Sequence, residues 1–372
     1  MIKLYDYIIV GSGLFGSVFA RQATDDGKKV LILEKRSHIA GNCYTENRKG
    51  INVHVYGPHI FHTNNDEIWD FVNKYTKFNN FINKPKVFYN NKIYSFPINL
   101  MTLYQMWGIT NPIDANKKLI SVRENIKEPK NLEEWCLSQI GRELYETFIK
   151  GYTQKQWKTD PKNLPSFIIK RLPIRLNFDE NYFFDKYQGI PIGGYTKMFE
   201  KILENIEVKT DVDFFKDVDY WKSKTKKIIY TGKIDEYYNY CYGELEYRTT
   251  LFEHDIYDVE DYQGNAIINY TNENIPYTRT IEHKHFDNVN TAHTIVTKEY
   301  PDVWDKSKIP YYPINDAKNT NIHEKYKELT YQEKNVIFGG RLSEYKYYDM
   351  HQVIGSALIT YKKIKNENTI SN

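Results

Sequence analysis

Residues 7–16 read YIIVGSGLFG, an apolar run that ends in three glycines spaced Gly-x-Gly-x-x-Gly. A continuous apolar run of this kind is typical of a strand buried on both faces of a parallel sheet. Residues 17–25 follow as a predicted helix, and residues 30–33 (VLIL) form a second apolar run with Glu34 at its end. The sequence therefore predicts a strand–helix–strand unit of about 30 residues.

The glycines in this setting indicate a dinucleotide site. They permit a tight turn and let a pyrophosphate approach the helix N-terminus, whose dipole favours an anion. Glu34 lies 18 residues beyond the third glycine, where a carboxylate can accept from both ribose hydroxyls and repel a 2′-phosphate. Residues 35–62 are then predicted to be polar and irregular, and so long a functional loop favours FAD over NAD.

The composition excludes several protein classes. The chain has 372 residues, 41% hydrophobic and 27% charged, with a net charge of +3. A chain of this length is expected to form two or three domains. Its small net charge gives no strong electrostatic field that would attract nucleic acid. No apolar run approaches the roughly 18 residues that span a bilayer, and the N-terminus does not look like a signal peptide. Cys43, Cys136 and Cys241 are too few and too far apart for a disulfide framework. We expect a cytoplasmic protein with no nucleic acid partner and no membrane insertion.

The rest of the chain favours helices first and strands later. Residues 95–160 predict helices, and Asn131 with Glu134 looks like an N-terminal cap. Residues 163–194 are expected to form a loop or lid. Strands are predicted within 227–232, 263–270, 293–299 and 336–341, and a closing helix over 350–364. Because ligands bind at strand C-terminal ends, the first and last units are expected to meet one cofactor.

Aromatic and arginine residues suggest a nucleotide diphosphate site. Tyr152 and Trp157 are able to stack on a base, although packing at a domain junction explains them equally well. Arg171 and Arg175 share one Pro-broken segment and Arg279 belongs to another, and arginines on separate loops are able to clamp a diphosphate, the alternative being solvated surface charges. Arginine is scarce in this lysine-rich chain, with 10 in total. Each arginine is therefore a better candidate for a bidentate contact with a phosphate or a carboxylate.

Other chemistry is disfavoured. His59 and His62 flank a Gly-Pro turn rather than a helix, and no acidic or cysteine cluster lies near them in the sequence, so no metal is expected. The chain has no GxSxG motif and no P-loop, which argues against nucleophilic hydrolases and kinases.

Longer strings resemble the bacterial UDP-galactopyranose mutase family over essentially the whole chain. Besides residues 7–16 they are VYGPHIFHT (55–63), KGYT (150–153), QW (156–157), IKRLP (169–173), IPYTR (275–279), PYYP (310–313), GRL (340–342) and YKYYDM (345–350). Two positions depart from the family pattern: Ala40 stands where a glycine is usual, and Lys158 follows Trp157 in place of glycine.

The resemblance implies an isomerase that interconverts UDP-galactopyranose and UDP-galactofuranose without net oxidation, active only with reduced FAD. The flavin N5 would form a covalent adduct with the sugar while UDP departs, and the product would serve cell-surface polysaccharide. A homodimer is also implied, with NAD(P)H or a reductase as reductant. The alternatives are the same chemistry on UDP-N-acetylgalactosamine, an amine-oxidase-like flavoprotein oxidoreductase, and an inactive UDP-sugar-binding protein.

The expected fold class is α/β, a Rossmann-like FAD-binding domain with an inserted helical bundle and an antiparallel β-sheet domain. The FAD-binding domain is expected at 1–78, 188–242 and 325–372, and the helical domain at 95–165. The sheet domain is expected at 79–94, 166–187 and 243–324, with a mobile lid near 165–178.

The resemblance also assigns roles by position. The catalytic residues would be Arg171, Arg279 and His59. The two arginines would share the substrate pocket with Asn83, Phe148, Tyr152, Thr153, Trp157, Tyr182, Phe183, Asn269, Tyr312 and Tyr347. The cofactor would contact Gly11, Gly13, Leu14, Phe15, Gly16, Glu34, Lys35, Gly41, Asn42, His59, Ile60, Arg341, Tyr348, Asp349 and Met350, and His62 would lie beside flavin and sugar.

Overall fold

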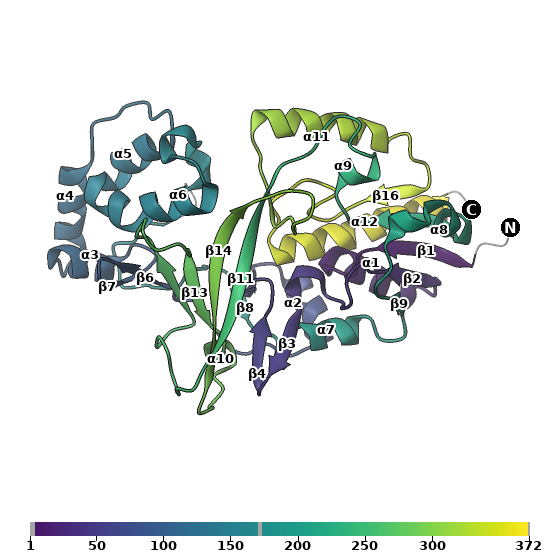
Figure 1. Ribbon diagram of the computed structural model, residues 1–372, viewed down its shortest axis with the longest axis horizontal. Coiled ribbons are helices and arrows are strands. Elements are labelled where there is room, and N and C mark those ends of the chain that lie inside the picture. The colour runs from purple at the N-terminus through teal and green to yellow at the C-terminus, as the bar shows by residue number, and fades with distance from the viewer. Residues whose placement is uncertain (1–3, 170–172, 371–372) are drawn as a thin grey trace.

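A five-stranded parallel sheet forms around the opening stretch of the sequence. The computed structural model describes residues 4–169 and 173–370 (Figure 1). The sheet has the order β16-β10-β1-β2-β9, and every neighbouring pair is parallel. Its strands are β1 (Tyr5–Val10), β2 (Val30–Leu33), β9 (Glu207–Lys209), β10 (Thr225–Tyr230) and β16 (Val336–Phe338). The predicted first, second and last strands are confirmed.

Apolar side chains on both faces stabilise this sheet. Ile8 pairs with Leu31 and packs on one face with Phe214. Ile9 packs on the other face with Phe19, beneath α1 (Leu14–Asp25) and α12 (Met350–Ile370). Burying each such side chain contributes about 1.5–3 kcal/mol, which explains why two uninterrupted apolar runs suffice to predict the centre of the sheet.

The prediction that residues 35–62 are irregular is wrong. They contain a hairpin of β3 (Thr45–Arg48) and β4 (Ile51–His54), and then β5 (Phe61–Thr63). Ile51 and Val53 alternate with polar residues and are fully buried, as expected of a strand with one face on a core. Each strand has only three or four residues, too few for the alternation to stand out from a polar loop.

A second sheet of seven strands lies beside the first (Figure 1). Its order is β15-β11-β14-β13-β12-β6-β7, antiparallel except for the parallel pair β12–β6. Its strands are β6 (Lys86–Tyr89), β7 (Lys92–Ser95), β11 (Tyr247–Tyr257), β12 (Ile267–Tyr270), β13 (Arg279–Glu282), β14 (Thr294–Val303) and β15 (Tyr312–Pro313). β8 (Tyr187–Gly189) pairs separately with β5. The predicted antiparallel sheet is confirmed.

Four helices gather at the end of the molecule away from the parallel sheet (Figure 1). They are α3 (Leu100–Trp107), α4 (Pro112–Val122), α5 (Leu132–Tyr145) and α6 (Gly151–Trp157), with their own apolar core. Asn131 caps α5 by accepting from the Glu134 N–H, as predicted, whereas the Glu134 carboxylate accepts from the Lys130 N–H. The expected α/β fold with a helical insertion is therefore confirmed.

The remaining helices are distributed over the other parts of the chain. They are α2 (Asp66–Asn73), α7 (Tyr195–Ile202), α8 (Val218–Lys224), α9 (Ile234–Tyr237), α10 (Lys284–Asp287) and α11 (Ala317–Thr330). Over the described residues, none of the helices combines the length and apolar character needed to span a membrane. The domain boundaries given above stay predictions.

Candidate active site

The glycine turn between β1 and α1 leaves the N-terminus of α1 bare. Gly13 is the N-cap and offers no side-chain hydrogen bond, and the first turn has no acidic residue. A Cβ on Gly16 would lie 2.1 Å from the carbonyl oxygen of Gly11. Gly41, at φ +54°, belongs to a second loop so close that its Cβ would lie 3.1 Å from the Gly13 Cα. The free N–H groups and the helix dipole therefore suit a phosphate.

A cavity of about 310 Å³ lies beside this turn. Most of the residues predicted to contact the cofactor line it: Gly11, Gly13, Leu14, Phe15, Gly16, Glu34, Lys35, Gly41, Asn42, His59, Arg341 and Met350. Ile60, Tyr348 and Asp349 do not belong to its lining. Ile60 packs instead in an apolar cluster that includes Ile190. The first and last strand units thus border one cavity.

Glu34 is held in position by its own loop. One carboxylate oxygen accepts from the N–H and the hydroxyl of Ser12, at 2.8 and 2.7 Å, and the other from the Arg36 N–H at 3.0 Å. A carboxylate offers about four lone-pair sites, so about one remains for a ligand. The predicted contact with both ribose hydroxyls would require the Ser12 hydroxyl to turn away.

Arg36 is a cavity residue that sequence reasoning missed. Its Nη2 donates to the Asn42 side chain at 2.9 Å, and its guanidinium lies 4.5 Å from the centre of the Tyr56 ring. Its Nη1 is buried and has no hydrogen-bond partner among the described residues. An unpaired buried cationic donor in a cavity wall fits an anionic or carbonyl-rich ligand. The scarcity of arginine was the signal that would have found it.

His59 borders the same cavity as a neutral imidazole. Its Nδ1 lies 2.9 Å from the Gly57 carbonyl oxygen and therefore carries the proton. Burial lowers the pKa of His59 to about 4, and the charges of Arg341 and Arg279 act in the same direction. At neutral pH the ring thus offers an acceptor at Nε2 rather than a positive charge.

Three more histidines hold the loop that carries His59. The His59 N–H donates to Nδ1 of His54, and the His54 N–H donates to Nδ1 of His283. The proton of His283 is therefore on Nε2, which lies 2.6 Å from the Thr297 hydroxyl, and that hydroxyl lies 2.6 Å from Nδ1 of His254. Only one direction of donation, from His283 through Thr297 to His254, satisfies this chain. It requires each histidine to be neutral.

Arg279 is fixed by a carboxylate on the neighbouring strand. Arg279 of β13 and Glu299 of β14 are register partners, and the Arg279 Nε–H donates to Glu299, which is 1% exposed. Burial alone would lower the pKa of Arg279, but Glu299, Tyr152 and Tyr312 raise it above its ordinary value. Asn269 pairs with Arg279 from the opposite strand. The guanidinium is thus permanently charged, and among the described residues only its Nε–H has an assigned hydrogen-bond partner.

Tyrosines lie close to Arg279 and to Arg341. Tyr312 stacks on Tyr347 with ring centres 5.2 Å apart, and the Arg341 guanidinium lies 6.0 and 5.8 Å from the two rings. Burial raises the pKa of Tyr312 to about 12 and also raises that of Tyr152, so both keep their phenolic protons. Protonated hydroxyls and guanidinium groups are donors, which is what a diphosphate requires.

Comparison with known proteins assigns the family. A model described as UDP-galactopyranose mutase matches residues 147–347, and one described as an NAD(P)-binding Rossmann-like domain matches residues 9–75. A probable UDP-galactopyranose mutase of Klebsiella pneumoniae is 43% identical over 95% of this chain and 93% of that protein. The chain belongs to the UDP-galactopyranose mutase family.

Two further similarities bear on the site and the fold. A dTDP-fucopyranose mutase of Escherichia coli is 40% identical over 94% of this chain and 96% of that protein. A crystal structure titled reduced UDP-galactopyranose mutase superposes with a TM-score of 0.72, covering 98% of this chain and 94% of that chain at 12% identity. That structure supports the fold alone.

The nucleotide pocket expected from the family is partly assembled. The Tyr182 N–H donates to the Asn83 carbonyl at 2.8 Å, and Tyr182 meets Phe183 edge to face at 5.0 Å. The side-chain oxygen of Asn83 is buried without a partner among the described residues. The Trp157 ring lies 5.4 Å from the guanidinium of Arg248, a residue that sequence reasoning missed.

Three expected residues are placed differently or lie outside the structure. Phe148 is 3% exposed and packs against Tyr94 in the core of the helical region, so it is a core residue rather than a residue of the pocket surface. Thr153 is also buried, at 4%. Arg171 lies outside the described residues.

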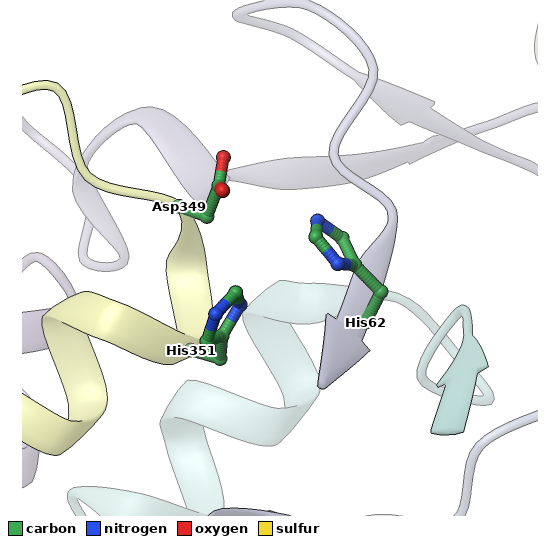
Figure 2. A group of neighbouring side chains, drawn as sticks. All are labelled: His62, Asp349 and His351. Atoms are coloured by element: carbon green, nitrogen blue, oxygen red, sulfur yellow. The ribbon is translucent and has the colours of Figure 1, made fainter. Parts of the chain in front are cut away.

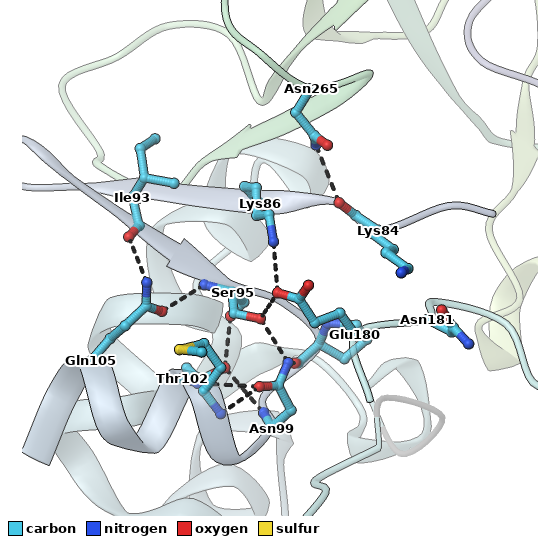
Figure 3. Close-up of polar contacts among 12 residues, drawn as sticks. Lys84, Lys86, Ile93, Ser95, Asn99, Thr102, Gln105, Glu180, Asn181 and Asn265 are labelled. Atoms are coloured by element: carbon cyan, nitrogen blue, oxygen red, sulfur yellow. Dashed lines mark hydrogen bonds and ion pairs between the residues drawn. The ribbon is translucent and has the colours of Figure 1, made fainter. Parts of the chain in front are cut away.

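A polar network anchors the segment that carries Tyr182 and Phe183 (Figure 3). Glu180 accepts from Lys86 Nζ at 2.6 Å and from the Ser95 hydroxyl at 2.5 Å, and Ser95 accepts from the Asn99 side chain at 2.8 Å. Burial alone would raise the pKa of Glu180, but these two hydrogen bonds lower it. The network ties this segment to the β6–β7 hairpin and the start of α3.

The fold gives His62 acidic neighbours that its surroundings in the sequence did not indicate. Its Nδ1 lies 2.7 Å from the Asp185 carboxylate, and Phe183 stacks on its ring at 3.8 Å. Asp349 and His351 lie close to it as well. These residues are far from His62 in the chain, and only the folding of α12 and the 183–187 segment onto β5 brings them together.

Proposed function

We propose that this protein is a mutase that interconverts UDP-galactopyranose and UDP-galactofuranose on reduced FAD, without net oxidation. The family assignment and the 43% identical relative support a mutase of nucleotide sugars. The observation that carries the proposal is Arg279, which Glu299 holds in place next to Tyr152 and Tyr312. Arg341 of the cofactor cavity lies 6.0 Å from the centre of the same Tyr312 ring.

The cavity residues fit an FAD group. The bare N-terminus of α1 would hold the pyrophosphate, Glu34 a ribose hydroxyl, and the unpaired Nη1 of Arg36 a further acceptor. When bound and reduced, the flavin supplies a nitrogen nucleophile and is regenerated in each turnover. Neutral His59 would accept a hydrogen bond beside it without adding charge.

The chain's own residues would act on the diphosphate. The terminal nitrogens of Arg279 would bind its oxygens in bidentate fashion, because Nε is already committed to Glu299. Glu299 would keep the guanidinium from rotating, so no reorganisation is needed as charge grows on the leaving group. Tyr312 and Tyr347 would add hydroxyl donors, and Arg171 would complete the arginine pair.

Product analysis under reducing conditions tests the proposal. Purified protein with UDP-galactopyranose and dithionite should give a second UDP-hexose that chromatography separates, with no oxidant consumed. Stoichiometric consumption of an oxidant would favour the amine-oxidase-like alternative, and binding without any product would favour the inactive UDP-sugar-binding alternative.

A second candidate is the same isomerisation of dTDP-fucopyranose, because a relative 40% identical over 94% of this chain carries that name. Competition between the UDP-sugar and the dTDP-sugar for turnover decides between them, and UDP-N-acetylgalactosamine belongs in the same assay. The homodimer and the reductant stay predictions.

A further inference from the structure

His62, Asp349 and His351 form a cluster outside the walls of the cofactor cavity (Figure 2). His62 belongs to β5, Asp349 precedes α12, and His351 is in the first turn of that helix. One nitrogen from each ring and one carboxylate oxygen all lie within 4.8 Å of one another. Figure 2 shows the three side chains directed toward a common point.

Hydrogen bonding indicates which ring nitrogens remain available to a ligand. His62 Nδ1 lies 2.7 Å from the Asp185 carboxylate, which accepts only, so this nitrogen carries a proton and, in the neutral ring, Nε2 has the lone pair. The His351 Nδ1 is buried and has no hydrogen-bond partner among the described residues. In a neutral His351 ring with its proton on Nε2, the buried Nδ1 holds the lone pair.

Two nitrogen lone pairs and the Asp349 carboxylate thus converge without a donor between them. Such an arrangement costs free energy unless a proton or a cation lies at the centre. In metal sites, a histidine that binds the ion through one ring nitrogen usually donates the N–H of the other nitrogen to a carboxylate or a backbone carbonyl. Asp185 serves His62 in this way.

We propose that His62, Asp349 and His351 bind one Zn²⁺ or similar divalent transition ion, with water as the fourth ligand. Two imidazoles and one carboxylate are ligands such ions prefer. A tetrahedral ion with ligand distances of about 2.0–2.1 Å holds its ligand atoms about 3.4 Å apart, so the atoms must close by about 1.4 Å at most. The carboxylates of Asp185 and Asp349 offset the two positive charges.

An ion at this site would join two parts of the active site. His62 stacks on Phe183 of the expected nucleotide pocket, and Met350, between Asp349 and His351, lines the cofactor cavity. Binding would therefore fasten β5 to the start of α12 and raise the melting temperature.

Zinc titration of the full-length, flavin-containing protein tests the proposal without substrate or turnover, so its failure is independent of the mutase proposal. The chelator-treated protein competes with a chromophoric chelator for Zn²⁺. We expect one tight ion per chain and a higher melting temperature. His351→Ala should weaken affinity by more than about 100-fold, and Asp185→Asn, which alters an outer partner, by about 10-fold.

His285→Ala is the matched control. His285 belongs to the other cluster of possible ligands in the described parts of the chain, with Asp261 and Glu282, and its loss should leave affinity unchanged. Cys241→Ser controls for binding at an exposed thiol. The proposal fails if no ion binds tightly at one per chain, if His351→Ala retains full affinity, or if a control variant loses the ion instead. In each of these cases the cluster is held together by a shared proton rather than by a metal ion.

Discussion

Protonation of buried histidines should destabilise this protein as the pH falls from 7 to 5.5. Burial lowers the pKa of His54 to about 3 and that of His283 well below 6.5. The unfolded chain takes up these protons near pH 6.5 and the folded chain does not, so acid favours unfolding. Each residue costs about 1.2 kcal/mol between pH 7 and 5.5, or about 2.5 kcal/mol together. Most carboxylates titrate below this range and contribute little.

Urea unfolding followed by circular dichroism, at fixed flavin concentration, measures this loss at each pH. His54→Asn is the matched variant, because its amide oxygen can replace Nδ1 as acceptor for the His59 N–H but does not titrate. Its stability should fall by about 1.2 kcal/mol less than that of the unchanged protein over the same range. Equal pH dependence in the two proteins, or constant stability from pH 7 to 5.5, would refute the reasoning.

Three further outcomes are expected. Arg279→Ala and Arg171→Ala should each lower turnover about 100-fold or more, as does removal of one donor to a developing anion. Near-normal turnover of either variant in product assays would contradict its role in binding the diphosphate. Glu180→Gln, which removes the charge that Lys86 and Ser95 contact, should raise KM for the nucleotide sugar more than it lowers kcat, and an unchanged KM would argue against an anchoring role. Gly16→Ala places a Cβ 2.1 Å from a carbonyl oxygen, so the purified protein should lack the yellow flavin colour; a full flavin spectrum would show that the turn adapts.

Features that depend on neighbours in the chain were predictable from the sequence. The β1–α1–β2 unit follows from two apolar runs, a glycine turn and an acid at the right spacing. The Asn131 cap and α12 are equally local. The hairpin of β3 and β4 was missed because its strands are short and half polar, and β11 because charged residues such as Glu253 and Asp255 face outward along it.

Features that depend on strand register or distant segments were not predictable. Glu299 becomes the partner of Arg279 only because β13 and β14 align in one particular register. The approach of Asp185 and His351 to His62 requires three separate segments to pack together. Arg36 and Arg248 gain significance only from the cavity and the ring they face.

The central claim is that Arg279 and the cofactor cavity together serve a redox-neutral isomerisation. The most direct measurement compares the conversion of UDP-galactopyranose by the same flavin-loaded preparation before and after reduction with dithionite. The account predicts a furanose product only from the reduced preparation, with the flavin still reduced at the end. Equal activity in the oxidised preparation, or no furanose from the reduced one with any of the three nucleotide sugars, would contradict it.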